Sequence, residues 1–569
     1  MRYAILFILI YIISLIRPTI TLAVTDPLVV PNNRFGIHVI DSNDLEDAAR
    51  LVNSNGGDWG YITIVITKNE RDIDRWQNTF DQLRRLHLIP IIRIATQLEG
   101  DKWQKPDPND INSWADFLNS LNWVVKNRYV IIFNEPNHAK EWGSDINPEE
   151  YTQILSTFSD RLKEKSEDFF ILPAGLDAAA PNGSDTMDIS TFLSRMMDKD
   201  TTIFDKLDGW TSHSYPNPGF VGTALDFGKG TIKSYIWEQN LLKELGFTKN
   251  LPVFITETGW PHREGINFNR NFLPQNLAGE YTRQAFTSVW RETNLVAITP
   301  FVFSYQSYPF DNFSWKMPEN IGFYDAYYEV EQIPKTRGEP EQRIDIEIAG
   351  DPIAQKLITD SHYTFLVNIK NSGQSIFEES QNYTVDITSS NLITSVLENY
   401  FIEPDKNGAI TYELKTGNTP GKYDFNISLK HKEEIIDSYD RIVEVIEPPN
   451  LKLEVNTGLN TQTSSTDFSL LILDDDEKPV VEFTNLDIKN SKGEVKKLKD
   501  VVVGKNYRVV LKKPYYLPRQ SIITFQEADN FIKFKPLIPL DLDLDGKFSL
   551  GDYWLIVFHP LFALSLVFQ

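Results

Sequence analysis

The chain has 569 residues, contains no cysteine and carries a formal net charge of −23 at pH 7. The chain is longer than a single domain with one hydrophobic core usually is, so we expect several domains. The acidic balance argues against a nucleic-acid partner, because the chain would be repelled by a phosphate backbone. The lack of cysteine excludes disulfides and thiolate metal sites.

The N-terminus has the pattern of a secretory signal peptide. Met1-Arg2-Tyr3 precedes an apolar run at residues 4–16, and Thr21-Leu22-Ala23 supplies a small residue for cleavage. The alternative, an uncleaved anchor, is disfavoured because the run is shorter than the roughly 20 residues of a spanning helix. We therefore expect residues 1–23 to be removed and the protein to be secreted or held at the cell surface.

Between residues 30 and 335, short apolar runs alternate with stretches of helical period, which predicts an α/β fold. The predicted strands are residues 35–40, 61–66, 90–95, 129–133, 169–174, 209–214, 252–256 and 296–304. The helical stretches include residues 72–86, 111–125, 148–163 and 276–291. Eight alternations fit a (β/α)8 TIM barrel, whose active site lies where strands end. A doubly wound open sheet is the alternative, but no Gly-rich phosphate-binding sequence follows an early strand.

Two of the predicted strands, 129–133 and 252–256, are each followed by a turn that carries a glutamate, Glu135 and Glu257 respectively. Burying an unpaired carboxylate is costly, so both are candidates for a functional site. They lie 122 residues apart, which accommodates three βα units of about 40 residues each, and so places them after strands four and seven. Two carboxylates at one end of a barrel indicate cleavage of a glycosidic bond. The alternative is that each only caps the helix that follows.

The sequences Asn134-Glu135-Pro136 and Glu257-Thr258-Gly259-Trp260 resemble clan A of the retaining glycoside hydrolases, and families 5 and 39 in particular. The resemblance implies that Glu135 is the general acid/base and Glu257 the nucleophile. It also implies that Asn134 holds the sugar hydroxyl beside the reacting carbon. Retention requires the two carboxyls to lie about 5 to 5.5 Å apart, whereas inversion leaves roughly 6.5 to 9.5 Å.

Three further polar residues at predicted strand ends could serve this chemistry. His213 and Tyr215 end the sixth strand, where similar members of the clan carry a His-x-Tyr element beside the nucleophile. Tyr215 could donate a hydrogen bond to Glu257 and keep it ionised; the alternative is a core histidine and a packing tyrosine. Arg93, in the third strand, could hold the nucleophile's charge or form a salt bridge within the barrel.

Aromatic residues after the strands are candidates for stacking on a sugar ring. They are Trp260, Tyr305 and Trp315, together with Trp59 and Trp142, and core packing explains each equally well. A histidine metal site is another alternative, formed by His38, His138, His213 and His262. No His-x-x-x-His pair supports it, and retaining hydrolysis needs no metal, so we expect no catalytic cofactor.

After residue 340 the pattern changes to short alternating segments with turn signals. Segments such as 363–369, 383–387, 409–414 and 423–429 predict an Ig-like β-sandwich module at residues 340–447. Pro448-Pro449-Asn450 marks a boundary, and a second β-rich module is expected at residues 450–536.

The segment 537–569 contains a predicted calcium loop. Oxygen ligands occupy positions one, three, five, nine and twelve of a twelve-residue loop, with glycine at six and the carbonyl of Lys547 at seven. These residues are Asp541, Asp543, Asp545, Gly546, Ser549 and Asp552. A solvated acidic turn without metal is the alternative. Aspartate at the last position makes this EF-hand-like loop resemble a dockerin loop, although only one copy is visible, so a calcium-stabilised module is favoured over a cohesin-type partner.

The apolar run at residues 554–568 is interrupted by His559 and Pro560. It predicts an amphipathic helix packed on its own domain rather than a membrane anchor. Together, the patterns predict a secreted retaining β-glycoside hydrolase that acts on a polysaccharide or oligosaccharide. The alternative is a surface carbohydrate-binding or scaffold protein whose barrel has no turnover.

Overall fold

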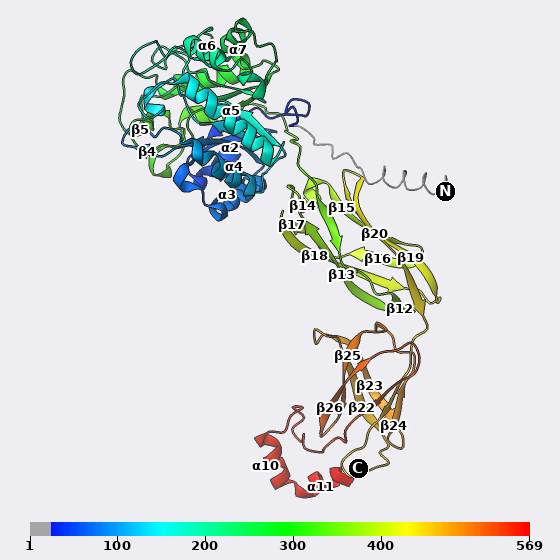
Figure 1. The fold of residues 1–569 in the computed structure, drawn as a ribbon. Helices are drawn as coiled ribbons and strands as arrows, with labels where there is room; N and C mark the ends of the chain where they lie inside the picture. The colour runs from blue at the N-terminus through cyan, green and yellow to red at the C-terminus, as the bar shows by residue number, and fades with distance from the viewer. Residues whose placement is uncertain (1–23, 569) are drawn as a thin grey trace, which may run out of the picture. The chain divides into compact units, whose positions relative to one another are not determined.

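The computed structural model describes residues 24–568, and the chain forms two compact units that divide after Arg343. The predicted signal peptide, residues 1–23, lies outside the described residues. The first unit contains the alternating strands and helices, and the second is built almost entirely from strands (Figure 1).

The first unit is an eight-stranded parallel barrel. Its strands are β1 (Gly36–His38), β2 (Gly60–Thr67), β3 (Leu88–Ala95), β6 (Arg128–Ile132), β7 (Phe169–Leu172), β8 (Trp210–His213), β9 (Val253–Glu257) and β10 (Leu295–Ile298). They pair in parallel in the orders β1-β2-β3-β6-β7 and β10-β9-β8. A parallel bridge between Phe35 and Ile298 and another between Asp177 and His213 close the ring. The predicted TIM barrel is therefore formed.

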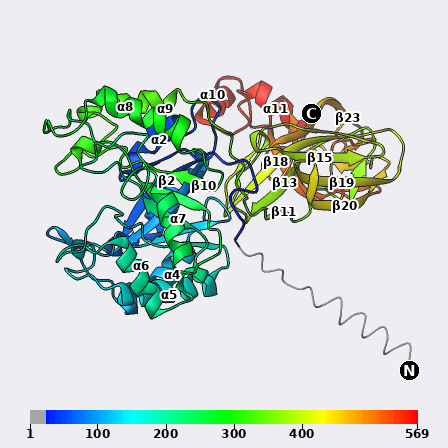
Figure 2. The same ribbon diagram turned by 90° about the horizontal axis from the view of Figure 1, so that it is seen from above.

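Helices lie outside these strands, and Figure 2 shows β2 and β10 in the middle of the unit. The helices are α2 (Leu45–Val52), α3 (Ile73–Arg85), α4 (Ile111–Ser120), α5 (Pro148–Lys165), α6 (Ile189–Lys199), α7 (Ser234–Glu244), α8 (Gln275–Gln284) and α9 (Asp325–Glu331). Side-chain caps explain several starts: Asp72 accepts from the Arg75 amide, and Asn147 accepts from that of Glu150. A short hairpin, β4 (Leu98–Glu99) and β5 (Lys102–Trp103), follows β3.

Aromatic rings fill the barrel interior. The Tyr129 ring lies 4.9 Å from that of Phe170 and 5.4 Å from that of Phe254, centroid to centroid, although β6 and β9 are not neighbours in the sheet. These rings therefore point inward and form a packed core. We therefore expect functional side chains at the ends of the barrel and not in its interior.

The predicted eighth strand, residues 296–304, is too long. β10 ends at Ile298, and Pro300 follows. Proline has no amide hydrogen and cannot donate to the next rung of a ladder, which accounts for the early end. The predicted helix at 111–125 likewise ends at Ser120, and the one at 276–291 continues from α8 as a π-helical turn over Ala285–Val289.

The second unit begins with a two-sheet module around one buried core. Its sheets have the orders β11-β13-β18-β16 and β12-β20-β19-β15, with a small β14-β17 pair. The strands are β11 (Ile346–Ala349), β12 (Lys356–Ile358), β13 (His362–Asn371), β14 (Phe377–Glu378), β15 (Tyr383–Ser389), β16 (Leu392–Val396), β17 (Phe401–Ile402), β18 (Lys406–Thr416), β19 (Gly421–His431) and β20 (Glu434–Ile446). This is a β-sandwich, the layer arrangement expected from alternating burial along each strand.

A second core of the same kind follows residue 450. Its sheets have the orders β24-β21-β27 and β23-β22-β25-β26. The strands are β21 (Leu451–Glu454), β22 (Ser465–Leu473), β23 (Pro479–Ile488), β24 (Lys492–Val495), β25 (Asn506–Lys513), β26 (Tyr516–Thr524) and β27 (Asn530–Lys533). The unit ends with helices α10 (Leu550–Phe558) and α11 (Pro560–Phe568).

The predicted amphipathic helix at residues 554–568 is not formed. Pro560 starts a new helix, and the axes of α10 and α11 differ by 103°. Exposed positions such as Phe558 and Leu561 and buried or packed positions such as Leu555 and Leu566 are alike apolar, so neither helix has a clear polar face. No single helix of the described residues has the length and apolar character to cross a bilayer, although this bent pair meets both criteria when taken together.

Candidate active site

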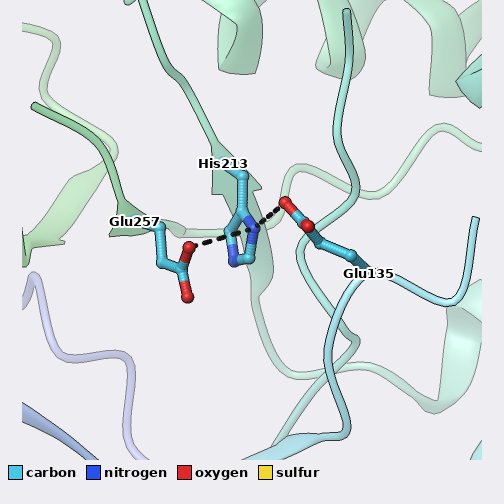
Figure 3. A group of neighbouring side chains, drawn as sticks. All are labelled: Glu135, His213 and Glu257. Carbon is cyan, nitrogen blue, oxygen red and sulfur yellow. Dashed lines mark hydrogen bonds and ion pairs between the residues drawn. The ribbon is translucent and has the colours of Figure 1, made fainter. Parts of the chain in front are cut away.

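Glu135 and Glu257 meet at the C-terminal end of the barrel. Glu257 is the last residue of β9, and Glu135 follows β6 by three positions. One carboxylate oxygen of each and a ring nitrogen of His213 all lie within 4.8 Å of one another. Figure 3 shows the imidazole of His213 between the two carboxylates. Two acidic groups and one histidine therefore face a common point.

The backbone around Glu135 adopts an unusual conformation. Phe133 has φ 68° and Glu135 has φ 30°, both in the left-handed region that side chains other than glycine avoid. The amide of Glu135 donates to the carbonyl of Gly175 at 3.2 Å. The buried side-chain amide of Asn137 donates through Nδ2 to the carbonyls of Asp177 and Met187, at 3.0 and 3.1 Å. Such strained residues persist where their surroundings hold them, and they are common at functional sites.

Glu257 lies in an environment that favours the ionised form. Its side chain pairs with the guanidinium of Arg93, and Tyr215 Oη donates to its Oε2 at 3.1 Å. Burial by itself would raise the pKa of Glu257, but the charges of His213 and Arg93 outweigh burial and hold that pKa well below its ordinary value. The carboxylate is therefore poised as a nucleophile rather than as an acid.

Glu135 has a different partner. Its Oε1 lies 2.7 Å from Nδ1 of His213, whereas Oε2 of Glu257 lies 3.8 Å from the same nitrogen. Burial lowers the pKa of His213, but the charge of Glu257 and the hydrogen bond to Glu135 more than offset it, so the net shift is upward. The two glutamates thus have unlike surroundings, as an acid and a nucleophile require.

Strand β8, which carries His213, is fixed from behind by a buried glutamate of α7. Trp210 Nε1 and Ser212 Oγ each donate to Glu238, both at 2.8 Å. Burial raises the pKa of Glu238 to about 7. The sequence gives no signal for this residue beyond a lone acidic position in a helix.

Asn134 and Arg93 belong to one network with Glu141. Nη1 of Arg93 donates to Oδ1 of Asn134 at 2.7 Å, and Nδ2 of Asn134 donates to Oε2 of Glu141 at 3.2 Å. Burial and repulsion from Glu135 raise the pKa of Glu141. Glu141 was not among the residues predicted from the sequence, because this residue lies in a short 3-10 turn (Ala139–Glu141) and not at the end of a strand.

His38, at the end of β1, is a buried histidine whose ring nitrogens have no hydrogen-bond partner. Burial and the charge of Arg93 lower its pKa to about 3, so it is neutral. Its ring lies 5.3 Å from that of Phe301.

The four histidines of the alternative metal site do not come together as one group of ligands. His138 pairs with Asp177 at 3.0 Å, and Nε2 of His262 lies 2.9 Å from the carbonyl of Ser314. Among the described residues of the barrel, only Glu135, His213 and Glu257 form a group that could hold a metal. The guanidinium of Arg93 already supplies a cation to that group.

The proposed tryptophan platforms are core residues. Trp260 is 5% exposed and its indole donates to the carbonyl of Gly222 at 2.7 Å, while Trp315 is 4% exposed. Trp59 stacks on His87, and Trp142 is fully buried. Tyr305 is partly exposed and packs edge-on against Phe310. Of the aromatic candidates, only Tyr305 offers an accessible ring.

Instead, a run of aromatic contacts leads away from Glu257. It passes from Tyr215 to Phe220, Phe313, Phe301, Phe310 and Tyr305, with centroids 5.2 to 5.8 Å apart at each step. Phe310, the ring next to Tyr305 in this run, is exposed. These rings come from the loops after β8 and β10. Tyr215 and Tyr305 were candidates from the sequence, whereas the phenylalanines between them were not, because phenylalanines in loops have no period.

The C-terminal acidic loop brings three of its predicted ligands together. Carboxylate oxygens of Asp541, Asp543 and Asp552 lie within 4.8 Å of one another, while Asp545 is not part of that group. Gly546 has φ 80°, and its amide donates to Asp541 at 3.1 Å. Burial and repulsion from the other aspartates raise the pKa of Asp541, an unfavourable arrangement that a bound cation would relieve.

No protein-family model and no curated protein matches the sequence. Among solved structures, a family 39 glycoside hydrolase from Bacteroides cellulosilyticus WH2 is 12% identical, with a TM-score of 0.38 over 69% of this chain and 82% of that chain. A monomeric β-xylosidase from Caulobacter crescentus CB15 is 10% identical, with a TM-score of 0.37 over 83% and 96%. A family 51 α-L-arabinofuranosidase from Bifidobacterium longum is 10% identical, with a TM-score of 0.37 over 68% and 97%. These likenesses are weak, so the functional argument depends on the site.

Proposed function

We propose that the protein is a retaining β-glycoside hydrolase that cleaves a polysaccharide or oligosaccharide by double displacement. The observation that carries the proposal is the approach of the Glu135 and Glu257 carboxylates, whose oxygens lie within 4.8 Å. Retaining enzymes keep their carboxyls about 5 to 5.5 Å apart, and inverting enzymes need room for a water between theirs. The close approach of one oxygen from each carboxylate supports the retaining arrangement.

In the first step, the Glu257 carboxylate attacks the anomeric carbon and forms a glycosyl ester. Arg93 and Tyr215 hold it ionised and oriented until attack. Glu135, in its protonated form, gives its proton to the glycosidic oxygen as the bond to the leaving group breaks. His213 donates Nδ1–H to the other oxygen of Glu135 and so directs the acidic proton toward the substrate.

In the second step, water attacks the anomeric carbon and the ester bond to Glu257 breaks. Glu135, now ionised, takes a proton from that water, which restores both groups to their starting states. One water molecule is consumed per bond cleaved. Asn134, held by Arg93 and Glu141, is placed to bond the sugar hydroxyl beside the reacting carbon. No metal or cofactor takes part in these steps.

The competing function is carbohydrate binding without turnover. A binding site needs no difference between its carboxylates, whereas here Glu257 is held ionised by Arg93 and Glu135 is held by His213. The test is a panel of chromogenic aryl β-glycosides, with polysaccharide pull-down in parallel. Hydrolysis that Glu257→Ala abolishes supports the enzyme, and binding without any hydrolysis supports the alternative.

We further propose that the loop at residues 541–552 binds Ca²⁺. Three carboxylates converge there without a basic partner in the group, and glycine makes the turn. The ion would stabilise the end of the second unit, and the single loop does not by itself argue for a cohesin-type partner. A secreted or surface location follows from the predicted signal peptide and suits an enzyme that acts on a polymer.

A further inference from the structure

Helices α10 and α11 present an unusual concentration of exposed apolar side chains. Trp554, Val557, Phe558, Leu561, Phe562 and Leu564 are each 45% or more exposed. A single exposed apolar residue is ordinary, but a contiguous set of this size marks a surface that contacts something else. We therefore expect α10 and α11 to contact a partner.

The composition of this segment identifies the kind of partner. From Tyr553 to Phe568 it contains no aspartate, glutamate, lysine or arginine. The inward side chains are also apolar: Leu566 is buried, and Leu555, Ile556 and Ala563 pack against the second sandwich core. A helix that binds one protein surface normally keeps a polar face toward water, whereas a helix that is apolar all round lies in a protein core or in lipid.

The ends of the segment also fit a membrane interface. Tyr553 and Trp554 are more than half exposed and come directly after the acidic loop. Tyrosine and tryptophan concentrate at the boundary between lipid headgroups and hydrocarbon, where one side of the ring is wet. The order along the chain is thus charged loop, interfacial aromatics and apolar helices.

The length of the helices limits how deep they can reach. Each has nine residues, which is about 14 Å of helix, and the axes are bent by 103° at Pro560. The hydrocarbon core of a bilayer is about 30 Å thick. In the described conformation, the pair therefore reaches into one leaflet and does not cross.

We propose that α10 and α11 embed in a lipid bilayer and hold the second unit at a membrane surface. The Tyr516 hydroxyl donates a hydrogen bond to the carbonyl of Leu566 and so connects α11 to the last sandwich. Insertion of the helices would therefore bring this sandwich to the membrane surface. The barrel would then act beside a membrane. This inference does not depend on the proposed glycosidase activity.

The test is flotation of the chain with the predicted signal peptide, residues 1–23, removed, on a sucrose gradient with neutral phosphatidylcholine vesicles. Neutral lipid is the right probe, because a chain of net charge −23 would be repelled by anionic vesicles and could be drawn to cationic ones by charge alone. We expect the protein to float with the vesicles and to remain bound at high salt, since apolar contact is not screened. Protein that stays at the bottom of the gradient overturns the proposal.

A matched pair of double variants makes the result specific. Val557→Glu with Leu561→Glu should abolish flotation, because both side chains are exposed and would carry charge into hydrocarbon. Ile393→Glu with Ile522→Glu, on exposed positions of the two sandwiches, should float like the wild type. Circular dichroism and hydrolytic activity, where present, check that each variant folds.

A second copy of the chain is the competing partner. If the wild type does not float but sediments as a dimer that Val557→Glu with Leu561→Glu converts to monomer, the helices are a self-association surface and the membrane proposal is wrong. Equal flotation of the helix variant and the wild type also contradicts it.

Discussion

The backbone of Gly175 lies directly against the imidazole of His213. A Cβ atom at position 175 would stand 2.2 Å from Cδ2 and 2.4 Å from Nε2 of that ring, closer than real Cβ contacts allow. His213 in turn bonds Glu135, whose own amide donates to the carbonyl of Gly175. The absence of a side chain at one position of the loop after β7 therefore helps to set the orientation of Glu135, the proposed acid/base.

Gly175→Ala should accordingly displace His213 and disable the site. We expect kcat to fall by about 10²-fold, the typical effect of moving a catalytic group by 1 Å. The matched control is Gly183→Ala in the same loop, where the nearest atom to the added Cβ would be 4.0 Å away. Steady-state kinetics on an aryl β-glycoside decides it. Normal turnover by folded Gly175→Ala would mean that the position of His213 is unimportant.

Removing the Tyr215 hydroxyl should change the pH dependence. Catalysis needs Glu257 ionised, and a hydrogen bond from the Tyr215 hydroxyl to its carboxylate favours that form. A hydrogen bond to a charged group is worth about 1.5 to 3 kcal/mol, so Tyr215→Phe should move the acidic limb of the kcat/KM profile up by about one to two pH units. Tyr328→Phe, at an exposed position of α9, should leave the limb in place. An unmoved limb in Tyr215→Phe would contradict the assignment of the nucleophile.

The same carboxyl links folding to pH. Because the pKa of Glu257 is lower in the folded than in the unfolded chain, its contribution to stability is present above the unfolded value and is lost as pH falls toward the folded value. Thermal unfolding of the wild type should therefore shift to lower temperature under acid conditions. Glu257→Gln should show a weaker acid dependence than the wild type.

Glu135→Gln separates the acid role from the base role. With a poor leaving group, kcat/KM should fall by about 10²- to 10⁴-fold, because the first step needs the proton. With a dinitrophenyl leaving group, which departs without protonation, kcat/KM should change little. Equal losses on both substrates would contradict a role for Glu135 as the acid.

Calcium should stabilise the second unit. At a concentration one hundred times the dissociation constant, binding adds about 2.7 kcal/mol to the free energy of unfolding. We expect scanning calorimetry to show this as a higher unfolding temperature that chelation reverses. Asp541→Asn with Asp543→Asn should remove the response, whereas Asp475→Asn with Asp476→Asn, in an acidic turn outside the loop, should keep it. A response that survives in the first variant would place the ion elsewhere.

The barrel was predictable because its signals are local and repeat. Each predicted strand overlaps an observed one, since buried parallel strands are continuous apolar runs of the kind seen in β2 and β3. The convergence of Glu135 and Glu257 followed from counting βα units. The approach of Asp541, Asp543 and Asp552 in the C-terminal loop also followed from spacing, whereas Asp545 lies outside that group.

Other features depend on contacts that no local pattern encodes. Gly175 is significant only because His213, 38 positions later, packs on it. The contribution of Glu141 depends on Asn134 reaching it across a turn, and Trp260 and Trp315 are buried by loops whose course the sequence does not specify. The terminal segment was predicted as one amphipathic helix although Pro560 interrupts it, and the exposure of its apolar side chains arises only in three dimensions.

The proposed double displacement requires a covalent bond between Glu257 and the sugar. Incubation with a set of 2-deoxy-2-fluoro glycosides that carry good leaving groups should trap the ester, and peptide mapping by mass spectrometry should locate it. We predict a single labelled site, Glu257, with the stereochemistry at the anomeric carbon retained in the product of the normal reaction. Label on any other residue, or a product of inverted configuration, would contradict double displacement with Glu257 as the nucleophile.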